Sequence, residues 1–226
     1  MATLDSVIDS ADVQAYMKAL RGARPLSVRL LGNGNLARIL GNDDFVDSTI
    51  PGTQLPALYA VRTLLGDNKG ASILYAASSY GLGMKIIEAA GYRNIRGIDL
   101  DVRAVNFCKS NGLYANVMDA AKTTFPNDSF DMVVSRDFVA PTYWQSQERI
   151  AEFLNEQHRI LKPGGFAVFT TMWPRSMDNI PKEELKISAF KNSSPAIDII
   201  HLTVPKGTEL GTTGKAPYFL LYCTKQ

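Results

Sequence analysis

The sequence predicts an α/β fold: a seven-stranded, mainly parallel sheet whose last strand is antiparallel, with helices on both faces and a helical N-terminal extension. Two observations predict this class. Short apolar runs alternate with helix-like segments along most of the chain, which is the order of a parallel sheet covered on both faces. The last two apolar runs have no helix between them, so we expect them to pair antiparallel.

The N-terminal segment is predicted to be helical. Within residues 1–24, apolar side chains recur at helical spacing at Val7, Val13, Tyr16, Met17 and Leu20. We interpret residues 1–54 as an extension or cap that contributes to the substrate side, and residues 55–226 as the main domain. A packed extension without a role in a site is the plainer alternative.

The main domain supplies the strands and the helices that cover them. Helices are expected where apolar residues recur three and four positions apart and turn residues end the pattern: 56–65, 84–90, 102–111 and 148–161. Strands are expected at short apolar runs: 73–77, 95–100, 114–118, 130–135, 166–171, 197–204 and 217–224. The alternation of the two kinds of segment gives the predicted layers.

Composition narrows the class of partner. The 226 residues are 46% hydrophobic and carry a net charge of +2 from 24 basic and 22 acidic side chains. That balance gives no electrostatic argument for nucleic acid or a membrane surface. No apolar run approaches the length of a membrane span, and the N-terminus lacks a signal-peptide pattern, so a cytoplasmic protein is expected. Cys108 and Cys223 are expected to be core residues, and no metal site is predicted.

Residues 72–101 form the unit around which the domain is predicted to be organised. A strand leads into a turn of small residues, then a helix and a second strand that ends at Asp99. Small residues let a ligand approach the backbone, and a carboxylate about 20 residues further on accepts hydrogen bonds from ribose hydroxyls. The unit therefore predicts a Rossmann-like site for a nucleotide-like ligand.

A second glycine-rich segment competes for the same interpretation. Residues 32–37 match Gly-x-Gly-x-x-Ala, the dinucleotide fingerprint. The fingerprint requires a following helix and a strand ending in an acid, but residues 41–44 stop any helix within about one turn, and no strand is predicted before Leu55. A solvent-facing turn or a substrate-side loop is favoured, and a nicotinamide-dependent oxidoreductase is the least favoured alternative.

Four segments, in order, resemble class I S-adenosylmethionine (SAM)-dependent methyltransferases of the type 11/25 kind. They are the strand and turn at 73–83, Gly97-Ile98-Asp99-Leu100, Asp119-Ala120 with 125–134, and 158–165. The most specific are Pro-x-x-Ser-Phe-Asp at 126–131 and Arg-x-Leu-Lys-Pro-Gly-Gly at 159–165. The resemblance spans about residues 55–172, and the last two strands match in topology only.

The resemblance implies SAM as the cofactor and places it on named residues. Asp99 matches the acid that holds the ribose hydroxyls, and Leu100 would flank the adenine. Asp119 matches the residue that bonds the adenine amino group, with Ala120 beside it. The remaining expected cofactor contacts lie on the methionine side: Tyr75, Ala77, Ser79, Gly81, Ser135 and Arg136.

Three of these positions depart from the family pattern. Ala77 and Ser79 stand where the first two glycines of a Gly-x-Gly-x-Gly turn are usual, and Tyr75 stands where an acid is usual. If Ala77 or Ser79 needs a positive φ, its Cβ would cost roughly 1 kcal/mol. Loss of the acid would remove a charge-assisted contact to the SAM amino group.

The resemblance implies methyl transfer to a small-molecule acceptor. Asp137 is a candidate general base, needed only if the nucleophile arrives protonated. Tyr143, Trp144 and Trp173 follow the fourth and fifth strands and favour an apolar or planar substrate, although they could instead pack the insertion on the sheet. The alternative function is a catalytically inactive relative that acts as a binding or partner subunit, and a homo-oligomer is possible.

Overall fold

The computed structural model describes residues 4–22, 54, 57–136, 147–172, 198–203 and 218–224. Residues 57–65 are helical, and the other elements are α1 (Leu4–Ile8), α2 (Ala11–Gly22), β1 (Ile73–Ala76), α6 (Leu82–Ala89), β2 (Ile95–Asp99), α7 (Val102–Ser110), β3 (Ala115–Val117), β4 (Phe130–Arg136), α8 (Gln147–Ile160), β5 (Leu161–Met172), β6 (Asp198–Thr203) and β7 (Tyr218–Thr224). None of the helices among these residues is long and apolar enough to cross a membrane.

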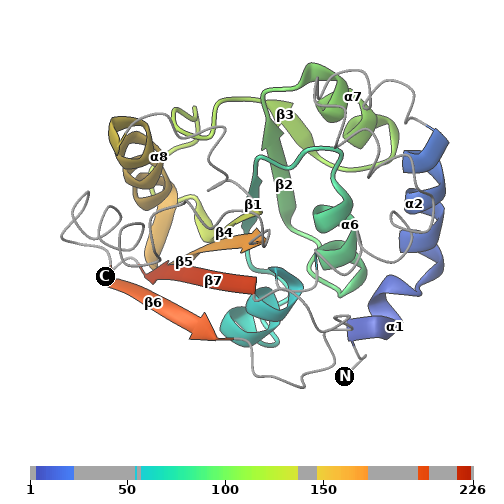
Figure 1. Cartoon of the computed structure of the whole chain (residues 1–226), viewed down its shortest axis with the longest axis horizontal. Helices are drawn as coiled ribbons and strands as arrows, with labels where there is room; N and C mark the ends of the chain where they lie inside the picture. The colour runs from blue at the N-terminus through green and yellow to red at the C-terminus, as the bar shows by residue number, and fades with distance from the viewer. Residues whose placement is uncertain are drawn as a thin grey trace, which may run out of the picture.

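The strands form one sheet in the order β3-β2-β1-β4-β5-β7-β6 (Figure 1). The five strands from β3 to β5 run parallel, and β7 pairs antiparallel with both β5 and β6. The predicted Rossmann-like α/β class and its parallel sheet are confirmed. In the sheet, β2 and β3 lie on one side of β1, and β4 and β5 lie on the other, so the strand order reverses at β1. Ligands of such folds bind beyond the carboxyl ends of the strands, where the strand order reverses.

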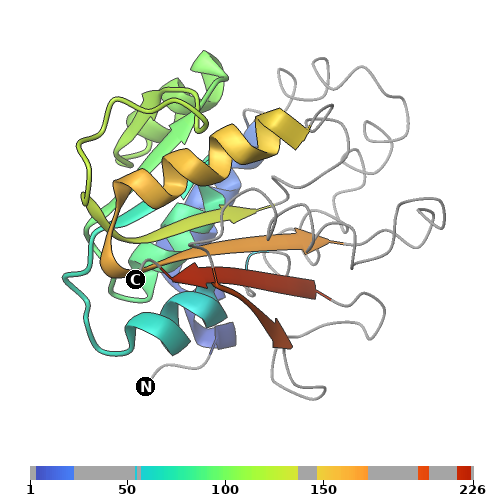
Figure 2. The ribbon, with the colours of Figure 1, turned by 90° about the vertical axis from the view of Figure 1, so that its left-hand side faces the viewer.

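The sheet separates two apolar layers, and β1 contributes to both. Ile73 and Tyr75 belong to the layer that α2, α6 and α7 cover, whereas Leu74 and Ala76 belong to the layer under α8. Successive side chains of a strand point to opposite faces, so a short buried strand supplies both layers. Figures 1 and 2 show α8 on the opposite side of the sheet from α2 and α6.

The described part of the N-terminal extension is a layer of the core. α1 and α2 pack against α6, and the apolar positions predicted from helical spacing are buried: Val7, Val13, Tyr16 and Met17. Residues 4–22 therefore share one apolar core with α6. The predicted role of residues 1–54 on the substrate side stays a prediction.

One strand boundary differs from the prediction. The expected strand begins at Phe166, after a Lys-Pro-Gly-Gly turn, but β5 begins at Leu161. Its pairing jumps from Phe130↔Leu161 to Met132↔Phe166, so residues 162–165 bulge out opposite Asp131. Gly164 takes a φ of 75°, which glycine adopts readily. The turn is present as predicted, but it interrupts a strand that has already begun.

Candidate functional site

Parallel pairing brings the ends of three central strands together. Ala76 of β1 lies opposite Ile98 of β2 on one side and Ser135 of β4 on the other. Asp99 ends β2 and Arg136 ends β4. The turn that follows β1 is therefore placed between two strand ends that carry predicted site residues.

The turn at 77–81 has an unusual backbone. Ala77, Ser79 and Gly81 have φ values of 55°, 49° and 74°, all in the left-handed region. For Ala77 and Ser79 this conformation costs about 1 kcal/mol or more each, because the Cβ approaches the following carbonyl oxygen. The sequence predicted this strain only if φ were positive, and φ is positive at both Ala77 and Ser79. The chain keeps a glycine-type path without the first two glycines.

Backbone hydrogen bonds join this turn to β2. Ser78 N–H donates to Ile98 O at 2.9 Å, and Ser79 N–H donates to Asp99 Oδ2 at 2.7 Å. Asp99 Oδ1 accepts a second bond from Asp101 N–H at 2.9 Å. A carboxylate has about four lone-pair sites, so both oxygens can still accept from a ligand. The contacts orient Asp99 and leave it able to bind hydroxyls.

Two buried hydroxyls lie at the same strand ends. The side-chain oxygens of Ser78 and Ser135 have no hydrogen-bond partner among the described residues. Ser135 is fully buried within β4, and Ser78 sits in the turn. Buried polar atoms in folded proteins nearly always find a partner, which is often a ligand or water at functional sites. The two hydroxyls fit a place where polar atoms of a ligand complete the structure.

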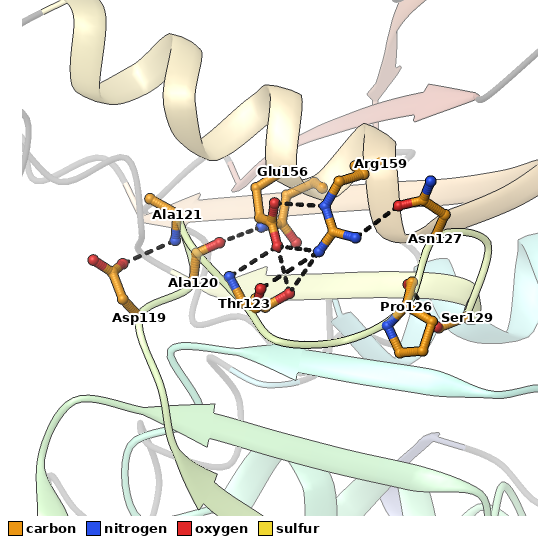
Figure 3. A network of polar contacts seen from close by, with 10 residues as sticks. Asp119, Ala120, Ala121, Thr123, Pro126, Asn127, Ser129, Glu156 and Arg159 are labelled. Atoms are coloured by element: carbon orange, nitrogen blue, oxygen red, sulfur yellow. Dashed lines mark hydrogen bonds and ion pairs between the residues drawn. The ribbon is translucent and has the colours of Figure 1, made fainter.

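A second segment flanks the site beyond β2 and β3. Leu100 follows β2 and is 67% exposed. Met118 N–H donates to Asp99 O at 3.1 Å, which holds the segment after β3 beside β2. Asp119 Oδ1 accepts from Ala121 N–H at 2.9 Å, and Ala120 O accepts from Gln157 Nε2 at 2.7 Å (Figure 3). An exposed apolar side chain therefore lies near a carboxylate held by its own loop.

A charged network fastens this segment to α8 (Figure 3). Glu156 Oε1 accepts from Thr123 N–H at 2.8 Å and from Arg159 Nη2 at 2.7 Å. Arg159 also donates to Asn127 Oδ1 at 2.8 Å. Burial acts to raise the pKa of Glu156, but the hydrogen bonds from Arg159 and Thr123 outweigh it and hold the pKa below its usual range. Residues 119–127 are thus tied to α8 by hydrogen bonds to two charged side chains, which themselves form an ion pair within α8.

Comparison with known proteins identifies the central part of the chain. Residues 74–169 match the family model described as "Methyltransferase domain". This match covers β1 to β5, including the turn and the segment after β3. Residues 74–169 thus match a methyltransferase domain, which agrees with the resemblance to class I SAM-dependent methyltransferases seen in the sequence. SAM is the cofactor of such a domain.

Two curated proteins resemble the chain at low identity. A fatty-acid O-methyltransferase of Mycolicibacterium smegmatis is 28% identical over 160 residues, which are 67% of this chain and 55% of that protein. A probable phthiotriol/phenolphthiotriol dimycocerosates methyltransferase of Mycobacterium ulcerans is 26% identical over 177 residues, 73% of this chain and 67% of that protein. The chain thus spans about half the length of the first relative.

Among solved structures, the [4+2]-cyclase SpnF superposes with a TM-score of 0.58 at 15% identity, covering 75% of this chain and 80% of that one. At this identity the likeness shows the fold alone. The methyltransferase domain therefore shares its architecture with a protein named for another reaction.

Tyr75, which stands where the resemblance leads one to expect an acid, makes a neutral hydrogen bond in the structure. Tyr75 is 3% exposed, and its O–H donates to Gln54 Oε1 at 2.9 Å. A Cβ at Gly83 would lie 2.6 Å from the same Gln54 oxygen. A neutral hydrogen-bonded pair thus packs closely against the first turn of α6. Sequence reasoning missed Gln54, and the only signal was that a buried tyrosine hydroxyl needs a partner.

Two other residues contact the turn although sequence reasoning assigned them only to the core. Tyr16 O–H donates to Tyr80 O at 2.7 Å, and the Cys108 thiol donates to Ser79 O at 3.5 Å. Cys108 is buried, as predicted. Helical spacing locates such residues on an apolar face, but it carries no information on which backbone oxygen a polar tip reaches.

Several predicted site residues lie outside the described part of the chain: Asp137, Tyr143, Trp144 and Trp173. The glycine-rich residues 32–37 also lie outside it. Their roles stay predictions. Arg136 is described as the last residue of β4, where it pairs with Thr170.

Proposed function

We propose that the domain binds SAM beyond the ends of β1, β2 and β4 and transfers its methyl group to a small-molecule acceptor. The observation that carries this proposal is the left-handed turn at 77–81 bonded directly to Asp99. It presents a close backbone approach and a ribose-binding carboxylate on neighbouring strands, which is the arrangement that nucleotide-like ligands require.

Each side of the cofactor has residues suited to it. Asp99 would accept hydrogen bonds from the ribose hydroxyls through its remaining lone pairs. Exposed Leu100 would cover one face of the adenine, and Asp119 and Ala120 would meet its polar edge.

The methionine side would face the turn and the end of β4. Ala77, Ser79 and Gly81 bring the backbone close to the ligand, and the hydroxyls of Ser78 and Ser135 can pair with its amino and carboxylate groups. Tyr75 supplies no charge there, so its proposed role is to support the turn through Gln54. The residues present therefore fit SAM, with a weaker hold on its amino group.

The reaction would be an in-line displacement at the methyl carbon that is bonded to the sulfonium sulfur. The acceptor would form a bond to this carbon as the carbon–sulfur bond breaks and SAH leaves. SAM supplies an already activated methyl group, so the protein's main task is to align the nucleophile. Asp137 is the proposed base if the acceptor is protonated. Tyr143, Trp144 and Trp173 are the proposed substrate wall, and the fatty-acid and dimycocerosate specificity in the names of the two relatives supports an apolar small molecule.

A catalytically inactive binding or partner subunit is the alternative, and the turn itself favours it. Strained Ala77 and Ser79 and the missing acid all weaken cofactor binding relative to a glycine turn. The fold does not decide between these functions, because one fold hosts many activities. Formation of S-adenosylhomocysteine (SAH) from SAM in the presence of candidate acceptors separates them.

Calorimetric titration with SAM and SAH tests the site. Asp99→Ala is expected to weaken SAM binding roughly 100-fold or more, because hydrogen bonds to charged groups are the strong ones. Asp131→Ala is the matched control. Asp131 also accepts a backbone bond, from Ser72 N–H at 2.7 Å, but at the opposite end of the strands. It should lower thermal stability and leave SAM affinity within about threefold.

Two results of the titration would contradict the proposal. Unchanged affinity in Asp99→Ala would show that the ribose site is misplaced. A wild-type protein that binds neither SAM nor SAH at millimolar concentration would overturn the proposal.

A further inference from the structure

The left-handed turn needs support from outside itself. Ala77 and Ser79 each disfavour the conformation that they adopt, so the competing extended form is closer in free energy than in a turn of three glycines. Within the turn, Gly81 N–H donates to Ser78 O at 2.9 Å. The peptide groups of residues 79 and 80 point their oxygens toward the helices that pack behind the turn.

Tyr16 of α2 reaches one of these oxygens. The tyrosine is almost fully buried, and its O–H donates to Tyr80 O at 2.7 Å. Burial raises the pKa of Tyr16, so the phenol remains a donor throughout the physiological range. The bond joins the N-terminal helix to the proposed cofactor turn.

Cys108 of α7 reaches the neighbouring oxygen. Its thiol donates to Ser79 O at 3.5 Å, and burial raises the pKa of the thiol to about 11. The proton that makes this contact is therefore retained at neutral pH. Two adjacent carbonyl oxygens of the turn thus face two neutral donors from two different helices.

Packing makes this arrangement tight. A Cβ at Gly81 would lie 2.7 Å from Cys108 Sγ and 2.8 Å from the Tyr16 hydroxyl. The ring of Phe107 makes edge contacts with the rings of both Tyr16 and Tyr80, at centroid distances of 5.6 and 5.5 Å. The two donors therefore pack closely against Gly81 of the turn.

We propose that Tyr16 is a positioning residue for cofactor binding: its hydroxyl, with Cys108 behind it, holds the strained turn in the conformation that accepts SAM. The inference rests on the proposed function and extends it to the N-terminal helix. When the left-handed and extended forms of the turn are close in free energy, removing one outside bond lowers the fraction of molecules that hold the left-handed form. The apparent dissociation constant for SAM then rises by the same factor as this fraction falls. α2 then supports the cofactor-binding turn in addition to covering the core.

The test compares two phenol-to-backbone hydrogen bonds. Tyr16→Phe removes the bond to Tyr80 O and the longer contact to Cys108 Sγ at 3.9 Å, and it keeps the ring. Tyr92→Phe removes a comparable bond, from Tyr92 O–H to Gly66 O at 2.6 Å; Tyr92 follows the C-terminal end of α6, whereas the turn precedes its N-terminal end. Both variants should lose similar thermal stability. Tyr16→Phe should also weaken SAM binding by roughly three- to tenfold and raise KM for SAM without lowering kcat, whereas Tyr92→Phe should change neither.

Relief of the strain provides a rescue experiment. Ser79→Gly removes one of the two strained Cβ atoms, so the turn should depend less on the outside bond. In the Ser79→Gly background, adding Tyr16→Phe should change SAM affinity by less than about twofold. An equal loss in both backgrounds would show that Tyr16 acts through general stability, and an unchanged SAM affinity in Tyr16→Phe would overturn the inference.

Hydrogen exchange keeps this test independent of the proposed function. In the free protein, Tyr16→Phe should speed amide exchange at Ser79 and Gly81 relative to Tyr92→Phe, and Ser79→Gly should remove the difference. If the wild type fails to bind SAM while the exchange result holds, the proposed function fails and the support of the turn by Tyr16 stands. Equal exchange in the two tyrosine variants would overturn the support itself.

Discussion

Two segments flank the proposed cofactor site, and they are held in opposite ways. The turn at 77–81 is strained and is supported by neutral donors, Tyr16 and Cys108. The segment at 119–127 has no residue with positive φ and is fastened by the ions Glu156 and Arg159. The first depends on backbone geometry and packing, and the second depends on charge. Steric substitutions should therefore disturb the turn, and acid should disturb the segment.

Gly81→Ala should have the largest effect, because it attacks the geometry of the turn. The new Cβ would meet Cys108, Leu113 and Tyr16 at 2.7 to 2.8 Å and would also hold a φ of 74°. Strain and overpacking together predict a loss of about 3 kcal/mol and of SAM binding. Thermal unfolding and calorimetry measure the two effects.

Gly112→Ala provides the control for Gly81→Ala. Gly112 has a similar φ of 79°, but a Cβ there would meet nothing within 4 Å. It should lose only the strain, roughly 1 kcal/mol, and keep SAM affinity. Equal losses in the two glycine variants would mean that packing against Tyr16 and Cys108 contributes nothing to the turn.

Sequence reasoning located this site better than it explained it. The order of strands and the acid at the end of β2 follow from periodicity and motif spacing, because each is written in local residues. The support of the turn is not local: Tyr16 belongs to α2, Cys108 follows β2, and Gln54 precedes the first strand. No spacing rule connects these three positions.

The departures from the family pattern were visible in the sequence, but their outcome was not. The sequence could state that Ala77 and Ser79 would be strained if φ were positive, whereas the positive φ values are seen only in the structure, where the turn bonds to β2 and accepts bonds from Tyr16 and Cys108. The proposed substrate wall, Tyr143, Trp144 and Trp173, is the opposite case. Its aromatic residues were named from the sequence, and they lie outside the described residues.

Glu156→Ala should have an intermediate effect, because it removes the acceptor at the centre of the charged network. Thr123 N–H and the Arg159 guanidinium would both lose their shared partner, which predicts a loss of about 2 kcal/mol. Glu88→Ala is the control, since its Lys85 pair is also a partly exposed i,i+3 pair but lies within one helix, and it should contribute about 0.5 kcal/mol or less. Urea unfolding measures both, and equal losses would show that the network is only a surface ion pair.

The smallest predicted effect is a difference in pH response between the two segments. The folded-state pKa of Glu156 is lowered, so its stabilisation is present above the unfolded value of about 4.3 and is lost as pH falls through the folded value. Asp101 and Asp131 also have lowered pKa values, so only the difference between wild type and Glu156→Gln isolates the segment. Glu156→Gln should flatten the acid side of the stability curve.

The turn should respond at the alkaline end instead. The folded pKa of Cys108 is raised to about 11, so its stabilisation is present below the unfolded value of about 8.5 and is lost as pH rises from there through the folded value. Cys108→Ala should remove this decline and leave the acid side unchanged, while Glu156→Gln should do the reverse. Thermal unfolding from pH 3 to pH 10 measures both arms. If either variant changed both the acid and the alkaline decline in stability, the two segments would not be supported independently. A single titrating group would then affect both the neutral contacts of the turn and the charged contacts on α8.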